Sequence, residues 1–199
     1  MRLIGMLDSP YVRRVAISLK LLDLPFELSQ VSVLRQFDDF AIINPVVKAP
    51  TLVTDDGITL MDSGLILDHA ERVAGRSLMP AAGHARALRL VGLAMAACEK
   101  SVQIIYERNL RPAEKQHQPW LDRVGGQMRA AYGMLDAEIG GDALLQPQIT
   151  AAVAWRFTQS VIPELALAAD YPALVVLSKR AEQTQAFRET DFAEVRLAK

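Results

Sequence analysis

RLIGMLDSPYVRR, residues 2–14, joins a short apolar run to a polar turn and then to a segment with helical spacing. The run RLIGML is typical of a buried strand. Ser9 and Pro10 fit the N-cap and first position of a helix, because serine accepts a backbone N–H there and proline already has a helical φ. One apolar face then follows, formed by Val12, Val15, Ala16, Leu19 and Leu22. The stretch therefore predicts a strand that leads directly into a helix.

The pattern up to about residue 80 continues this alternation of short elements. Residues 26–33 (FELSQVSV) resemble a second strand, and residues 34–43 are ambiguous, with a short helix as one interpretation. TLVT and ITLM, separated by DDG, predict a hairpin of two strands. MDSG, residues 61–64, then opens a helix capped by Asp62 or Ser63. A small mixed sheet with helices packed on it is expected.

The rest of the chain reads as helical after a linker at residues 74–83. Apolar residues recur there at spacings of three and four, which predicts a bundle of helices. The predicted seams are Leu88, Val91, Met95, Cys98, Val102 and Ile105; Trp120, Val124, Met128, Ala131, Leu135 and Ile139; Ile149, Val153, Phe157 and Val161; and Leu174, Leu177 and Ala181. We expect an α/β domain over residues 1–80 and an all-helical domain over residues 84–199.

Composition excludes several classes of function. The net charge of −1 gives no reason to expect nucleic acid or an acidic membrane as a partner. No apolar run approaches the ~18 residues that span a bilayer. The single cysteine, Cys98, cannot form an intramolecular disulfide, which favours a reducing, cytoplasmic location. The three histidines lack metal-ligand spacing, so no metal site is expected.

Three short motifs each allow a structural and a functional interpretation. Ser9 is first of all a helix cap, but a hydroxyl at a helix N-terminus also suits an anion such as a thiolate. VVKAPTLV, residues 46–53, is a strand entered through a proline, and its sequence alone does not indicate a cis bond. Asp62 and Ser63 form a cap or, alternatively, hold the ammonium and carboxylate of an amino-acid head group.

Taken together and in order, SPYVRR, NPVVKAPTLV and DSGLILDH, followed by a helical domain, resemble the glutathione transferases over essentially the whole chain. The resemblance implies a thioredoxin-like N-terminal domain, β-α-β-α-β-β-α, followed by an all-helical C-terminal bundle. Residues 34–43 would then hold the second helix.

The resemblance also implies roles for residues in two of the motifs. Pro50 looks like the cis-proline that precedes the third strand, and the backbone of Ala49 would pair with the cysteinyl part of glutathione like an added strand. Lys48 matches a position whose side chain approaches the glycyl carboxylate. Asp62 and Ser63 match the acidic-Ser pair that holds the γ-glutamyl end.

Ser9 matches the hydroxyl that donates to the sulfur, with Tyr11 as the next candidate. The implied chemistry is a glutathione thiolate that attacks an electrophilic carbon or reduces a peroxide or disulfide. Because no cysteine lies at position 9 or elsewhere in the first domain, classes that use a protein cysteine for exchange are disfavoured.

An electrophile would bind between the domains, with Tyr106, Arg111 and Trp120 as candidate walls. Each has a structural alternative: Trp120 lies on a predicted apolar seam, and Arg111 stands where a helix ends. Leu145 and Gln148 replace the Ser/Thr-x-x-Asp cap of many relatives, which predicts a weaker helix start.

The sequence thus predicts a cytoplasmic, homodimeric glutathione transferase that uses glutathione as co-substrate and no other cofactor. The alternative is a non-catalytic protein of the same fold with a stress or regulatory role.

Overall fold

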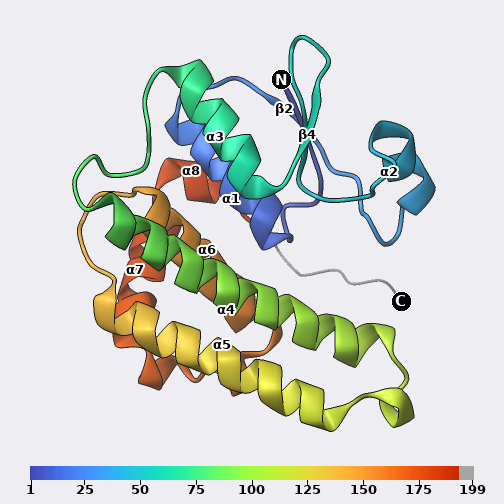
Figure 1. Cartoon of the computed structure of the whole chain (residues 1–199), viewed down its shortest axis with the longest axis vertical. Helices are drawn as coiled ribbons and strands as arrows, with labels where there is room; N and C mark the ends of the chain where they lie inside the picture. Colours follow the sequence, from blue (N-terminus) through green and yellow to red (C-terminus); the bar gives the residue numbers. More distant parts are fainter. Residues whose placement is uncertain (193–199) are drawn as a thin grey trace. The chain divides into compact units, whose positions relative to one another are not determined.

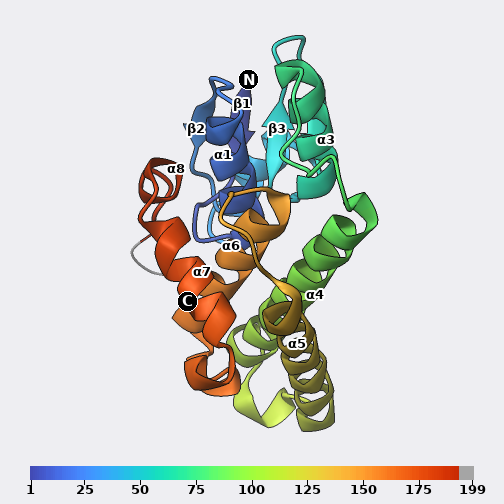
Figure 2. The same cartoon turned by 90° about the vertical axis from the view of Figure 1, so that its left-hand side faces the viewer.

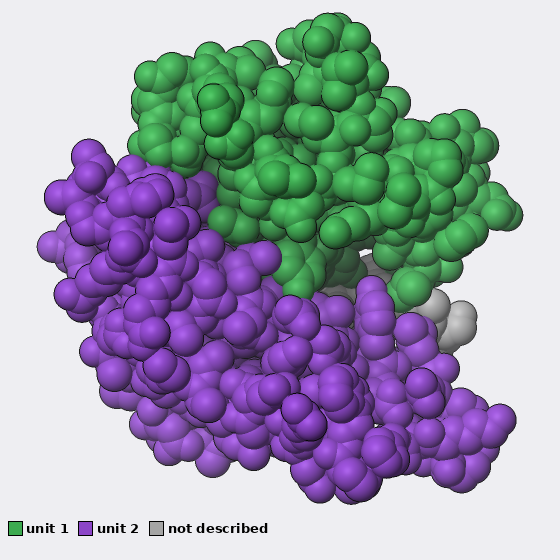
Figure 3. Space-filling model, viewed as in Figure 1, with its two compact units in different colours: residues 1–78, 184–196 green, residues 79–183, 197–199 purple. Residues whose placement is uncertain are grey.

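The computed structural model describes residues 1–192, which fall into two compact units (Figure 3). Unit 1 comprises residues 1–78 together with the described residues from Thr184 onward, and unit 2 comprises residues 79–183. The chain therefore leaves unit 1 once and returns to it, a return that the sequence analysis did not anticipate.

Unit 1 is a four-stranded mixed sheet with the strand order β2-β1-β3-β4. β1 pairs with β2 in parallel and with β3 antiparallel, and β3 pairs antiparallel with β4. Figure 1 shows α1 and α3 on one side of the sheet and α2 on the other, and Figure 2 shows β1 between β2 and β3. This confirms the predicted thioredoxin-like fold. The elements are β1 (Arg2–Ile4), α1 (Pro10–Leu21), β2 (Glu27–Ser29), α2 (Phe37–Ile43), β3 (Thr51–Val53), β4 (Thr59–Met61), α3 (Ser63–Ala74) and α8 (Gln185–Arg188).

The first strand and helix form as their residues predict. Ser9 is the N-cap of α1 and Pro10 is its first residue. All five residues of the predicted apolar face of α1 are buried. The second strand is shorter than predicted, since only Glu27–Ser29 of residues 26–33 pair with β1.

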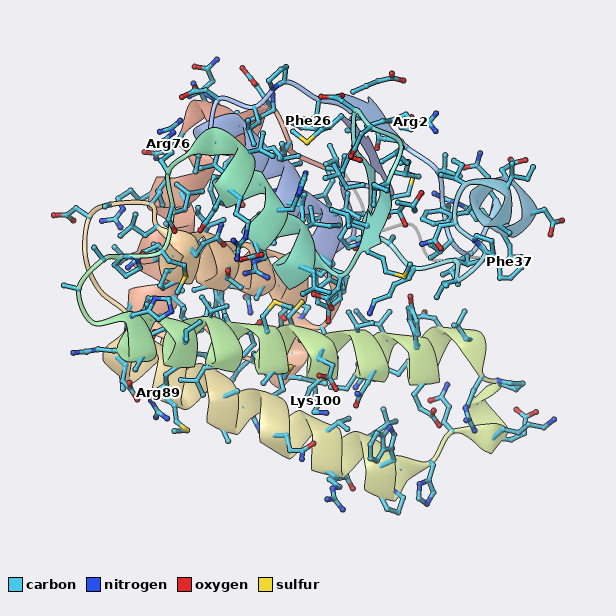
Figure 4. All side chains as sticks on the ribbon, turned by 45° about the horizontal axis from the view of Figure 1, so that its top comes forward. Arg2, Phe26, Phe37, Arg76, Arg89 and Lys100 are labelled. Carbon is cyan, nitrogen blue, oxygen red and sulfur yellow. The ribbon has the colours of Figure 1, made fainter. Side chains whose placement is uncertain are left out.

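Polar contacts fasten the far ends of α1 and α3 to each other. Arg76, labelled in Figure 4, follows α3 and donates from Nη2 to the Leu21 carbonyl at 2.9 Å. The same guanidinium pairs with Asp23, just beyond the C-terminus of α1. α1 and α3 thus pack on each other and are also linked at one end by these polar contacts.

The short helix α8 is anchored on α1 by Arg13, whose side chain is fully buried. Its Nε donates to the Thr190 carbonyl at 3.0 Å and its Nη2 to the Phe187 carbonyl at 3.2 Å. The guanidinium also stacks on the rings of Phe187 and Phe192, at 5.4 and 5.3 Å from their centroids. Carbonyls at a helix C-terminus and aromatic faces both attract a cation, so they offset the removal of this charge from water.

Unit 2 is helical, as the seams predicted. α4 packs on α5 and α6, and α6 packs on α7. Twelve of the sixteen residues of α6 are buried, which makes it the central helix of the bundle. The elements are α4 (His84–Leu110), η1 (Ala113–Lys115), α5 (Gln118–Glu138), α6 (Gln146–Val161), η2 (Pro163–Leu165), η3 (Ala168–Asp170) and α7 (Pro172–Glu182).

The buried face of α4 differs from the predicted seam by about one residue. Leu88 is 52% exposed, whereas small residues next to the predicted positions are buried. Small side chains let neighbouring helices approach closely, and the seam predicted for α4 missed them because it was drawn through larger apolar residues and contained no alanine or serine. The buried residues of α4 are Ala87, Leu90, Ala94, Ala97, Cys98, Ser101, Ile104, Ile105 and Glu107.

A buried hydrogen-bonded cluster crosses the core of unit 2. Thr158 Oγ1 on α6 lies 2.7 Å from Ser101 Oγ on α4 and 2.7 Å from the Tyr132 hydroxyl on α5. The hydroxyl of Tyr132 also donates to the Ala154 carbonyl at 2.9 Å. Burial raises the pKa of Tyr132 far above its ordinary value, so the phenol stays protonated in the folded protein.

Among the described residues, no helix combines the length and the apolar character needed to cross a membrane.

Candidate functional site

Ser9 lies at the start of α1, directly after the loop that leaves β1. Its Oγ accepts from the Val12 backbone N–H across a long 3.5 Å, and the side chain is half-buried. No described residue accepts the proton of its hydroxyl. The hydroxyl can therefore donate to a ligand while the N-terminal end of α1 contributes its positive dipole.

The loop from β1 to α1 lies directly against Ala49. Gly5 has a φ of 139°, and a Cβ built on it would lie 2.6 Å from Val12 Cγ2 and 3.3 Å from the Ala49 Cβ. A Cβ at this position would collide with Val12 and would crowd the Ala49 side chain. Glycine thus lets the loop that carries Ser9 approach the segment ahead of β3.

That segment holds the next three predicted residues in sequence. Lys48 is exposed, Ala49 is half-buried and Pro50 is buried. The Ala49–Pro50 peptide bond is cis, the geometry that the resemblance implied. No described residue accepts the Ala49 N–H, so this backbone donor is available to a ligand.

The start of α3 is the third segment of the candidate site. Asp62 is the N-cap, and its Oδ1 accepts from the Gly64 N–H at 2.8 Å. Its φ of 76° is unusual for a residue with a side chain, and backbone strain of this kind collects at functional sites. Ser63, the first residue of α3, is buried.

Two contacts join these segments. Lys48 Nζ lies 3.7 Å from Asp62 Oδ2, so the cation before β3 faces the carboxylate before α3. Arg14 Nη1 donates to Ser63 Oγ at 3.2 Å, which links the second turn of α1 to the first residue of α3. The structure thereby brings residues from three predicted motifs into direct or adjacent contact within unit 1.

The three predicted electrophile-pocket residues belong to unit 2. Tyr106 near the C-terminal end of α4 is 40% exposed, and Trp120 in the first turn of α5 is 38% exposed. The prediction that Trp120 lies on the apolar seam is therefore wrong, because the buried face of α5 begins one turn later, at Val124. Arg111 follows the last residue of α4 and pairs with Glu107, Nε to Oε2, at 3.0 Å.

Sequence reasoning gave no role to four residues that the structure connects to the site: Gly5, Arg14, Asn44 and Thr51. SPYVRR carried a signal for Arg14, since two adjacent arginines in an otherwise apolar helix require buried partners. Thr51 Oγ1 accepts from Asn44 Nδ2 and donates to the Lys48 carbonyl, seven and three residues away, and no periodicity or turn motif in the sequence marks these bonds.

The start of α6 agrees with the expected weak cap. Leu145 is the N-cap residue and its side chain makes no capping hydrogen bond. Gln148 instead donates from Nε2 to the Gly140 carbonyl at 2.5 Å, which ties the start of α6 to the preceding loop.

The arrangement in unit 1 suits a small molecule that carries both an ammonium and carboxylates. Asp62 offers an anion, Lys48 a cation, and Ser63 a hydroxyl at a helix N-terminus. Ser9 adds a hydroxyl donor at the start of another helix, where a developing negative charge is stabilised. Among the described residues, no group of three or more histidine, cysteine, aspartate or glutamate side chains could hold a metal ion.

A family model described as the glutathione S-transferase N-terminal domain matches residues 3–77. A solved glutathione S-transferase from Methylobacterium radiotolerans, in complex with glutathione sulfonate, is 27% identical with a TM-score of 0.90, and the match covers 100% of this chain and 98% of that one. A glutathione transferase family member from Pseudomonas fluorescens Pf-5, with bound S-(propanoic acid)-glutathione, is 30% identical with a TM-score of 0.81, covering 96% and 98%.

A glutathione S-transferase from Methylobacillus flagellatus with GSH bound has a TM-score of 0.85 at 19% identity, covering 95% of this chain and 98% of that one. At that identity the likeness is one of fold alone. A search of curated proteins gave no significant match.

Proposed function

The chain belongs to the glutathione S-transferase family, and from that membership we propose that it binds glutathione and activates its thiol for transfer to an electrophile. The observation that carries this proposal is the hydroxyl of Ser9. It lies at the N-terminus of α1, and no described residue accepts its proton. The same unit holds the charged and polar groups that a zwitterionic peptide needs.

In the proposed complex, each end of glutathione has its own partner. Asp62 holds the γ-glutamyl ammonium, while Ser63 and the N-terminus of α3 hold the γ-glutamyl carboxylate. The backbone of Ala49 pairs with the cysteinyl residue as an added strand, next to Pro50. Lys48 turns from Asp62 to the glycyl carboxylate, which its flexible side chain and its exposure allow.

Ser9 then acts on the sulfur. A free thiol has a pKa near ~8.5 and is mostly protonated at neutral pH. A hydrogen bond from Ser9 and the dipole of α1 favour the thiolate, and lowering the thiol pKa by about two units needs only ~2.7 kcal/mol. The proton leaves to solvent. The thiolate attacks an electrophilic carbon, the carbon–sulfur bond forms, and the leaving group departs with its electron pair.

Tyr106, Arg111 and Trp120 on unit 2 are proposed to contact the electrophile. A homodimer in the cytoplasm, acting in detoxification, is the proposed setting. Reduction of a peroxide by the same thiolate is the second reaction that the proposed chemistry allows.

Calorimetric titration with glutathione, followed by turnover assays, tests the proposal. We expect saturable binding, and turnover of at least one of an aryl halide, an organic peroxide and a mixed disulfide. Absence of binding at millimolar glutathione would refute the proposal. Binding without turnover of any of the three would instead favour a non-catalytic binding protein. Sedimentation velocity at the assay concentration tests the dimer.

A further inference from the structure

We propose that Thr51 is a positioning residue that, together with Asn44, aims the backbone N–H of Ala49 at bound glutathione. The inference rests on the proposed function, because it concerns how that site is held in shape. Both side chains are buried, Thr51 at 0% exposure and Asn44 at 1%. Neither side chain is among those proposed above to contact glutathione.

The hydrogen bonds of Asn44 and Thr51 form a chain in which each group donates to the next. Asn44 Nδ2 donates to Thr51 Oγ1 at 2.8 Å, and Thr51 Oγ1 donates to the Lys48 carbonyl at 2.7 Å. A hydroxyl has a single proton, and the amide of Asn44 approaches as a donor. The proton of Thr51 is therefore directed to the Lys48 carbonyl.

The Lys48 carbonyl matters because of the peptide bond to which it belongs. The C=O of Lys48 and the N–H of Ala49 are parts of one planar group and point in opposite directions. Holding the carbonyl toward Thr51 fixes the N–H of Ala49 on the opposite side. That N–H is the donor that no described residue accepts and that the proposed complex uses for the cysteinyl backbone.

Asn44 also holds the turn between α2 and β3. Its Oδ1 accepts from the Val46 N–H at 3.1 Å, and its carbonyl accepts from the Val47 N–H at 2.8 Å. Val47 has a φ of 52°, a conformation that a β-branched residue adopts only when its surroundings impose it. The side chain and the backbone carbonyl of one buried residue, Asn44, thus hold the loop ahead of Ala49 in a strained shape.

The test compares Thr51→Val, which keeps the shape of the side chain and removes the hydroxyl, with Thr51→Ser, which restores the hydroxyl. Thr158→Val is the matched control, because it removes a buried, hydrogen-bonded hydroxyl from unit 2. The measurements are the glutathione dissociation constant by calorimetry, KM and kcat at saturating electrophile, and the melting temperature.

We expect Thr51→Val to weaken glutathione binding about fivefold to tenfold, as for one misaligned hydrogen bond. KM for glutathione should rise more than kcat falls, because Ser9 belongs to another segment. Thr51→Ser should recover most of the lost affinity. Thr158→Val should lower the melting temperature without weakening binding.

Unchanged affinity in Thr51→Val would overturn the inference, and so would equal losses in the Val and Ser variants or in the Thr158 control. If Thr51→Val does not fold, Asn44→Asp takes its place. An aspartate keeps the acceptor for Val46 but attracts the Thr51 proton away from Lys48, so the same loss of affinity is expected and its absence overturns the inference. Failure of the unaltered protein to bind glutathione would refute the proposed function itself, which separates the two results.

Discussion

The Arg14 guanidinium donates to the Ser63 hydroxyl across 3.2 Å and so connects the second turn of α1 with the N-terminus of α3. Both side chains are buried. A buried hydrogen bond from a charged donor contributes about 1.5–3 kcal/mol to the free energy of unfolding. Removing Arg14 should therefore cost more stability than removing a charged residue from a surface pair.

We therefore expect Arg14→Met to lower the free energy of unfolding by about 1.5–3 kcal/mol and to weaken glutathione binding about tenfold or more. Arg72→Met is the control, because Arg72 pairs with Asp68 on the exposed face of α3 and such pairs contribute about 0–1 kcal/mol. Denaturant unfolding and calorimetric titration measure the two effects. Equal behaviour of the two variants would contradict the role given to Arg14.

Replacing Ser9 with alanine should change the ionisation of bound glutathione. Losing a hydrogen bond to the thiolate raises its pKa by about one to two units, and turnover below that pKa falls about tenfold to a hundredfold. The turnover rates of the unaltered protein and of Ser9→Ala should become equal at a pH above the thiol pKa of both proteins. Ultraviolet absorbance of the thiolate across a pH series measures the shift. An unchanged pKa would transfer the role to Tyr11.

Gly5→Ala should destabilise unit 1 through both strain and collision. A positive φ costs about 1–3 kcal/mol for a residue with a side chain, and overpacking against Val12 adds about 1–3 kcal/mol. Gly57→Ala is the matched control, because its φ is 86° and no atom lies within 4 Å of an added Cβ. Thermal unfolding should show the larger loss for Gly5→Ala. Similar losses of stability in the two variants would mean that the loop shifts to accommodate the added Cβ and that Val12 and Ala49 do not confine it.

Unit 2 should lose stability in acid partly through Glu138. Hydrogen bonds from Arg89, labelled in Figure 4, lower the pKa of the Glu138 carboxyl below its ordinary value of 4.5. Because the folded pKa is lower than the unfolded one, the pair stabilises the protein above pH 4.5, and this contribution is lost as pH falls through the folded pKa.

Glu138→Gln should consequently be less stable than the unaltered protein at neutral pH and lose less on acidification. Glu114→Gln, at a glutamate that pairs with no described residue, is the control. Denaturant unfolding at a series of pH values measures the difference, and added salt should reduce it. Parallel curves for Glu138→Gln and the unaltered protein would contradict the prediction.

Local signals predicted most of the fold of unit 1. The cap at Ser9, the DDG turn and the Asp62-Ser63 start of α3 are each decided by a few neighbouring residues, and all are present in the structure. Patterns of larger apolar residues predicted the helices of unit 2. They misplaced the buried face of α4 by about one residue, because four of its nine buried residues are alanine or serine, which a pattern of larger apolar residues does not mark.

The candidate site was predictable to the extent that it consists of helix starts and a proline turn. Asn44 and Thr51 form their hydrogen bonds within three to seven residues, but no periodicity or turn motif marks those bonds in the sequence. Arg14 carried the signal of a buried arginine, but its partner Ser63 lies 49 residues further along the chain and was not identifiable. The return of residues after Thr184 to unit 1 was unpredictable for the same reason. Arg13 donates hydrogen bonds to carbonyls that lie 174 and 177 residues further along the chain.

This last contact sets an order of events during synthesis. When Arg13 emerges from the ribosome, the carbonyls of Phe187 and Thr190 that will receive its charge have not yet been made. Every helix of unit 2 is translated in the interval. Arg13 therefore keeps its charge in water until α8 has been made, and unit 1 cannot complete this contact before the helices of unit 2 have been synthesised.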